Sequence, residues 1–167
     1  MGVASPLGCT IAGFWQRLLA GESGVTALLE DEFAGLSSRI GARVTGFDKA
    51  AFFDRKEARR MSRASQLALV AGAEAISQAR LHETPLDDVA VFIGSSIGGF
   101  SASDPFFRDY YPRGKQSALV IPLSMNSGPS ANLSIRYGFE GPTLTVDAAC
   151  ASAAHSIAYA FNLIRTG

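Results

Sequence analysis

The chain has 167 residues and a mass of 17.6 kDa; 47% of its residues are hydrophobic and 18% are charged. This is enough apolar material to bury a core, and too little charge for a disordered chain. The formal net charge is zero, with 15 basic and 15 acidic residues, which argues against a broad nucleic-acid-binding surface and against a nucleic-acid partner.

Short sequence features exclude further classes of protein. Cys9 and Cys150 are far apart and neither belongs to a CxxC motif, so neither a disulfide framework nor a zinc site is predicted. No apolar run reaches the roughly 18 residues of a membrane span. The N-terminal sequence MGVASPLGCT lacks the basic start of a secretory signal. We therefore expect a cytoplasmic protein that does not associate with membranes.

The hydrophobic pattern predicts helices that alternate with buried strands. Helices are expected over residues 11–19, over 55–81, between 127 and 138, and over 151–164. Thr10 is expected to cap the start of the first helix and Gly21 its end. Strands are expected over 89–93 and 143–146, with a weaker one at 39–44, while 101–121 shows no regular pattern. The alternation predicts an α/β fold, a sheet covered by helices on both faces. The chain opens without a leading strand, so we expect part of a larger domain.

Cys150 is the strongest candidate for chemistry. It lies between the strand 143–146 and the helix 151–164, so its side chain projects from the carboxyl end of a strand, where open α/β sheets bind ligands. A helix N-terminus favours the thiolate form and supplies backbone N–H donors for an oxyanion. The alternative is a small buried core cysteine, the commoner role of a free thiol. Position alone leaves the two interpretations about even.

Neither histidine is a convincing partner for that thiol. His155 follows Cys150 by five positions, which places it about 140° around the helix axis. We expect it to hydrogen-bond within the helix layer instead. His82 follows the predicted end of a helix, where a partly charged imidazole is favoured without any catalytic role.

Two further segments allow a structural and a functional interpretation. Residues 94–100 are rich in glycine but lack the GxGxxG spacing, which favours a tight turn over a backbone passing close to a ligand channel. A basic cluster, countered nearby only by Glu57, is either a solvated helix face or a docking site for an acidic protein or a phosphate. The cluster consists of Arg55, Lys56, Arg59, Arg60 and Arg63, and on a continuous helix its last four members share one face.

Five ordered motifs resemble those of the β-ketoacyl-acyl-carrier-protein synthases, above all the elongating enzymes of type II fatty-acid synthesis and their polyketide relatives. Residues 143–157, with the run DAACASA, are similar to the nucleophile motif of that family. The other four motifs are residues 2–8, 54–61, 94–99 and 137–142. The resemblance covers residues 1–167 and implies the N-terminal portion of a thiolase-like fold, without the family's first strand and its C-terminal half.

The resemblance also implies a function and a site. Cys150 would take an acyl group from a carrier protein as a thioester, and this would condense with the carbanion formed by decarboxylation of malonyl-acyl carrier protein. The backbone N–H of Cys150 would form part of an oxyanion hole. Ile97 would line or gate the acyl pocket, and Lys56, Arg59 and Arg60 would dock the acidic acyl carrier protein.

Other expectations concern the whole enzyme. The family is dimeric, and residues 120–127 fall where a partner subunit would close the acyl pocket; the resemblance implies no cofactor and no metal ion. The family's two catalytic histidines belong to its C-terminal half, so the 167 residues alone are expected not to condense. Two alternatives stay open. A non-catalytic chain-length-determining subunit is the weaker one because such subunits lack the active cysteine. A thiolase acting on coenzyme A thioesters is disfavoured by the basic segment and by the DAACASA run.

Overall fold

A pair of parallel strands lies at the centre of the protein. The computed structural model describes residues 1–167, apart from the side chain of Glu32. Strand β3 (Val91–Gly94) pairs with β4 (Thr143–Val146) in parallel, and Val91 lies opposite Thr143. Both strands were predicted from their apolar runs, although β3 begins two residues later than expected and continues to Gly94. Parallel neighbours need a long crossover, which here contains three helices.

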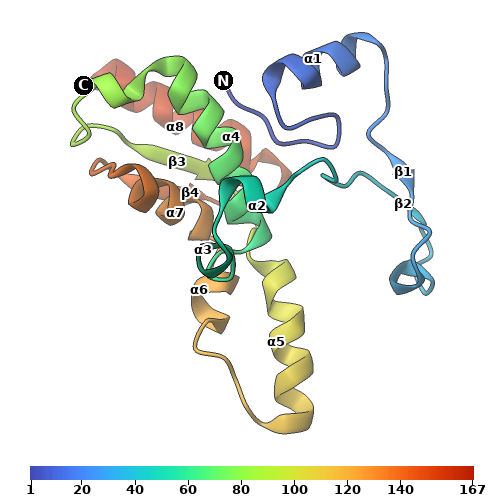
Figure 1. The fold of residues 1–167 in the computed structure, drawn as a ribbon. Coiled ribbons are helices and arrows are strands. Elements are labelled where there is room, and N and C mark those ends of the chain that lie inside the picture. The colour runs from blue at the N-terminus through green and yellow to red at the C-terminus, as the bar shows by residue number, and fades with distance from the viewer.

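Helices cover both faces of this pair of strands (Figure 1). Helix α8 (Ser152–Thr166) packs along one face and α7 (Gly128–Tyr137) along the other, with α4 (Arg63–Ala79) packed against α7. A Cβ added at Gly72 would lie 2.6 Å from Cδ2 of Leu133, so the glycine lets α4 and α7 approach closely. The buried core is formed by Phe53, Ala58, Met61, Leu69, Val70, Val91 and Leu133. The predicted α/β architecture is confirmed.

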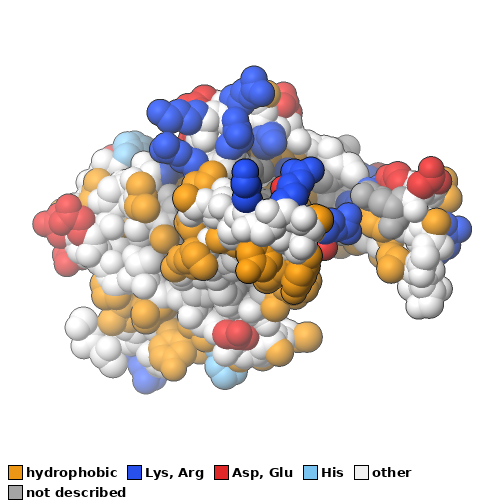
Figure 2. Space-filling model, turned by 90° about the horizontal axis from the view of Figure 1, so that it is seen from below, with side chains coloured by type: hydrophobic (Ala, Val, Ile, Leu, Met, Phe, Trp, Pro, Cys, Tyr) orange, Lys and Arg blue, Asp and Glu red, His pale blue; other side chains and the backbone are white. Residues whose placement is uncertain are grey.

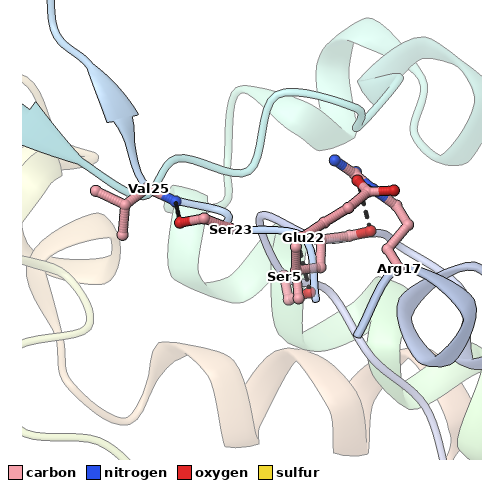
Figure 3. A network of polar contacts seen from close by, with 6 residues as sticks. Ser5, Arg17, Glu22, Ser23 and Val25 are labelled. Atoms are coloured by element: carbon pink, nitrogen blue, oxygen red, sulfur yellow. Dashed lines mark hydrogen bonds and ion pairs between the residues drawn. The ribbon is translucent and has the colours of Figure 1, made fainter. Parts of the chain in front are cut away.

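The N-terminal segment lies outside these layers (Figure 1). Helix α1 (Ile11–Leu19) begins as predicted, because the Thr10 side chain accepts a hydrogen bond from the Gly13 N–H. Beyond it, β1 (Thr26–Ala27) and β2 (Ile40–Gly41) form an antiparallel pair around the short helix η1 (Asp31–Phe33). The strand expected at 39–44 is therefore only two residues long. Figure 3 shows the ion pair between Arg17 and Glu22 that ties the end of α1 to the chain beyond it.

The prediction of one long helix over residues 55–81 is wrong. The chain forms α2 (Lys49–Phe52), α3 (Arg55–Ala58) and then α4, which is followed by the short helix η2 (Leu81–Glu83). The break has a local cause, because two capping side chains start new helices. Asp54 accepts a hydrogen bond from the Glu57 N–H, and Ser62 accepts one from the Ser65 N–H.

A helix that the sequence did not predict follows β3. Helix α5 (Phe100–Arg113) extends away from the sheet, and α6 (Val120–Ser124) leads back toward it (Figure 1). Pro105 and Pro112 lie inside α5, and prolines at such positions remove helical hydrogen bonds, so the pattern indicated an irregular segment.

The outer side of α8 is apolar and exposed. Ile157, Phe161 and Ile164 are all largely exposed, and Leu144 of β4 is half exposed. Within the described part of the chain, none of the helices has both the length and the apolar character that crossing a membrane requires.

Candidate active site

Cys150 lies in a short turn, η3 (Ala149–Ala151), between the end of β4 and the start of α8. Its side chain is exposed, so the interpretation as a buried core cysteine is wrong. Ala149 has a φ of +48°, a left-handed conformation that is uncommon for a residue with a Cβ. The buried Ser152 holds this conformation: its Oγ accepts from the Ala148 N–H at 2.9 Å and donates to the Ala149 carbonyl at 2.7 Å. The turn therefore presents the thiol on a fixed backbone.

The turn that carries Ile97 lies at the same edge of the sheet. Parallel strands end at one edge, and Gly94 at the end of β3 lies opposite Val146 at the end of β4. The Ser95 N–H donates to the Val146 carbonyl at 3.0 Å, which joins the two turns directly. Ile97 follows with 71% of its surface exposed. The sequence therefore brings Ile97 and Cys150 to neighbouring turns.

The close approach of β3 and α8 depends on one glycine. A Cβ added at Gly94 would lie 2.3 Å from the backbone carbon of Ser152 and 2.4 Å from the Ala153 nitrogen. No side chain fits at that distance. Residues 94–100 thus form the tight turn that their glycines predicted, and that turn passes close to the helix after Cys150.

Asn126 is a site residue that the sequence did not indicate. Its Oδ1 accepts from the Gly98 N–H at 3.0 Å and from the Ser95 hydroxyl at 2.7 Å, and its Nδ2 donates to the Ser95 carbonyl. The Ile97 turn is therefore held by the segment between α6 and α7. A single Asn in an irregular segment gives no sequence signal of such a contact.

The basic residues gather, but not in the predicted way. Helix α3 ends at Ala58, so Arg59 and Arg60 lie beyond it. The prediction that the basic residues share one face of a continuous helix is therefore wrong. Four basic residues of this segment still line one depression of about 510 Å³, together with Leu119. The four are Arg55, Lys56, Arg59 and Arg60. Figure 2 shows Lys and Arg side chains gathered on this side of the molecule beside hydrophobic ones.

Arg63, the remaining member of the predicted cluster, has other contacts. Its guanidinium donates to the Val44 carbonyl at 3.0 Å and lies 4.4 Å from the centre of the Phe47 ring. The Glu57 N–H, donating to Asp54, and the nearby charge of Lys56 lower the pKa of the Asp54 carboxyl below its ordinary value. Asp54 is thus a charged helix cap within the basic segment.

The histidines stay apart from Cys150. His155 is exposed on α8, so its predicted place within the packed helix layer is wrong. His82 lies in η2, with its Nε2 3.6 Å from the Glu83 carboxylate. Among the described residues, no hydrogen bond joins either histidine to Cys150, and no group of His, Cys, Asp and Glu side chains has the arrangement of a metal site.

Comparison with known proteins agrees with this arrangement. Residues 1–167 match the family model "Beta-ketoacyl synthase, N-terminal domain". A 3-oxoacyl-[acyl-carrier-protein] synthase 2 from a Synechocystis species is 32% identical over 171 residues, which cover 100% of this chain and 41% of that protein. The chain thus spans less than half the length of this curated relative.

Solved structures share the fold. A beta-ketoacyl synthase from Burkholderia phymatum superposes with a TM-score of 0.83 at 25% identity, over 99% of this chain and 42% of that one. The structure titled AntDE:AntF, a type II PKS acyl-carrier protein in complex with its ketosynthase, has a TM-score of 0.83 at 17% identity, over 99% and 45%. The expected N-terminal half of a thiolase-like fold is confirmed. With the family model matched from the first residue to the last, the chain belongs to the beta-ketoacyl synthases and corresponds to their N-terminal domain.

Proposed function

We propose that the chain contributes the nucleophile of a condensing acyltransferase that elongates fatty-acid or polyketide chains. The observation that carries this proposal is the exposed thiol of Cys150 on a fixed turn between β4 and α8. The relatives' names, 3-oxoacyl-[acyl-carrier-protein] synthase, support the reaction class. The acyl substrates determine whether the product is a fatty acid or a polyketide.

Two covalent steps follow from a cysteine nucleophile. The thiolate of Cys150 attacks the thioester carbonyl carbon of an acyl-acyl carrier protein, and the carrier leaves as its thiol after taking up the proton. Malonyl-acyl carrier protein then loses carbon dioxide, and the resulting carbanion attacks the Cys150 thioester. A carbon–carbon bond forms and the bond to the Cys150 sulfur breaks. The backbone N–H of Cys150, in the turn η3 just before α8, is suited to stabilise the oxyanion.

The acyl pocket is proposed to lie beside Ile97. This side chain is exposed on the turn next to Cys150, and an acyl chain bound to the sulfur needs an apolar surface close to that edge. Asn126 would keep this turn in position. Residues 120–127 follow α5 and are proposed to close the acyl pocket of a second copy in a homodimer.

The acyl carrier protein is the proposed partner of Lys56, Arg59 and Arg60. These side chains line an open depression, and an acidic protein is the partner that such a cluster attracts. The neighbour titled as a type II PKS acyl-carrier protein in complex with its ketosynthase supports this partner class. A cytoplasmic location stays a prediction.

Residues 1–167 on their own are proposed not to condense. Decarboxylation needs donors that stabilise the enolate charge, and the resemblance assigns these to histidines of the family's C-terminal half. Among the described residues, neither His82 nor His155 is hydrogen-bonded to Cys150. Incubation with acyl- and malonyl-acyl carrier protein should give no ketoacyl product, and measurable product would refute this point.

The test of the main proposal uses the 167-residue chain and an acyl-acyl carrier protein. Mass spectrometry should locate the acyl group on Cys150, and Cys150→Ser should abolish the modification. Cys9→Ser is the matched control, since Cys9 is the other free thiol of the sequence, and it should acylate normally.

The alternatives predict other results. A thiolase would be acylated from acyl-coenzyme A in preference to the carrier protein. A chain-length-determining subunit would leave Cys150 unmodified with both donors. Either result would overturn the assignment of Cys150 as the acyl acceptor from a carrier protein.

A further inference from the structure

Arg136 is tied to the basic segment from a distant part of the sequence. It lies in the last turn of α7, and 79 residues separate it from Glu57. Its Nη1 donates to Oε1 of Glu57 at 2.7 Å, and its Nη2 donates to the Phe52 carbonyl at 3.3 Å. The guanidinium also lies 5.2 Å from the centre of the buried Phe53 ring. One planar fork thus contacts α2, α3 and the residue between them, a geometry that lysine does not reproduce.

Glu57 is the acid that would otherwise weaken the basic segment. Between Asp54 and Arg60 the sequence holds four cations and two acids. The Asp54 carboxylate caps α3. The Glu57 carboxylate pairs with Arg136, and the two side chains are 39% and 35% exposed. Within the described residues, the ion pairs include none of Lys56, Arg59 and Arg60.

Without Arg136, the Glu57 carboxylate has cationic neighbours at hand. Lys56, Glu57, Arg60 and Arg136 line the same depression of about 370 Å³. Arg60 lies just beyond the end of α3, and its backbone N–H donates to the Glu57 carbonyl at 3.0 Å, so both side chains leave the same turn. A released Glu57 would therefore pair with Arg60 or Lys56 and lower the positive charge available to a partner.

We propose that Arg136 is a positioning residue that holds Glu57 away from the cations of the basic segment, so that Lys56, Arg59 and Arg60 present their full charge to an acidic carrier protein. This inference rests on the proposed function. It adds Arg136 of α7 to that function, as a residue that sets the affinity for the carrier protein by pairing with the Glu57 carboxylate.

The test measures the Kd of a purified acyl carrier protein for the 167-residue chain, at low and at high ionic strength. Arg136→Met keeps the apolar stem and removes the charge. It should weaken binding about five-fold at low ionic strength, the factor that corresponds to ~1 kcal/mol. The difference should shrink at high ionic strength because salt screens exposed charges.

A double variant separates charge from mere tethering. In Arg136→Met with Glu57→Gln, the unpaired carboxylate is gone, and the Kd should return to within about two-fold of the unchanged chain. A protein in which Arg136 only fastens α3 to α7 would stay weakened in the double variant, and that result would overturn the inference. Arg17→Met is the matched control, since Arg17 is also paired with a glutamate but lies on α1, and its Kd should not change.

Glu57→Gln alone keeps the test decisive where Arg136→Met does not fold. Because Glu57 is already paired, removing its charge should change the Kd by less than about two-fold. A five-fold gain in affinity would mean that Glu57 opposes docking in the unchanged chain, contrary to the inference. Failure of the unchanged chain to bind the carrier protein at any ionic strength would instead reject the proposed function.

Discussion

Gly94→Ala tests whether the close approach of β3 to α8 sets the position of Cys150. The added Cβ would lie 2.3 Å from the Ser152 carbon and 2.4 Å from the Ala153 nitrogen, whereas ordinary contacts begin at 3.4 Å. Backbone cannot rotate out of the way as a side chain can. The start of α8 must therefore move from the strand by about 1 Å, which is comparable to displacements that impair catalysis strongly.

The expected loss of stability follows from that clash. Overpacking of a core by one methyl group costs about 1–3 kcal/mol, and the reduced freedom of the unfolded chain offsets about 0.4–1 kcal/mol of it. We expect Gly94→Ala to lower the free energy of unfolding by about 1–2 kcal/mol. We also expect a changed rate of Cys150 alkylation by iodoacetamide, because the turn before Ser152 moves with the helix.

Urea denaturation of the 167-residue chain measures the loss of stability, and labelling with iodoacetamide below the unfolding transition measures the change in alkylation rate. Gly46→Ala is the matched control: a Cβ there has nothing within 4 Å, so stability should change by less than about 0.5 kcal/mol. If Gly94→Ala unfolds at the same urea concentration as Gly46→Ala and is alkylated at the same rate, the reasoning from the close approach is refuted.

Two further predictions concern the core and the pH dependence of stability. Leu133→Ala should lower the free energy of unfolding by about 3 kcal/mol, because Leu133 of α7 is 6% exposed and packs against α4. The exposed Ile135→Ala should change it by less than about 0.5 kcal/mol, and equal effects in urea denaturation would contradict the assigned core. The pKa of Asp54 is lower in the folded chain than in the unfolded one, so its contribution to stability is complete above the unfolded pKa and is lost as the pH falls below about 4. Asp54→Asn keeps a favoured helix cap and removes the titrating carboxyl, so it should reduce the acid-induced loss of stability in denaturation series at several pH values. An unchanged series would show that the charge of Asp54 does not contribute.

The sheet and its covering helices could be predicted because their signals are local. Two apolar runs gave β3 and β4, and Ser127, Pro129 and Gly138 marked the ends of α7. The break before α4 could also have been recognised, since Asp54 and Ser62 are both favoured helix caps. Helix α5 could not, because Pro105 and Pro112 inside it oppose a helical pattern.

The candidate site divides in the same way. Cys150 follows directly from its place between a strand and a helix. The contacts of Arg136 with Glu57 and of Asn126 with Ser95 join residues that are 79 and 31 positions apart. Such pairs depend on how the layers pack, and a single sequence holds no periodic or spacing signal for them. Predicting the basic segment from charge alone therefore found its cations and missed the arginine that pairs with its glutamate.

The two-stranded sheet has a consequence for the behaviour of residues 1–167 as an isolated polypeptide. Within the described residues, β3 and β4 pair only with each other, so each leaves one row of backbone N–H and C=O groups without a strand partner. Such rows are templates for pairing with another chain. Leu144 on β4 is exposed beside them. Aggregation at high concentration should therefore start at these strand edges.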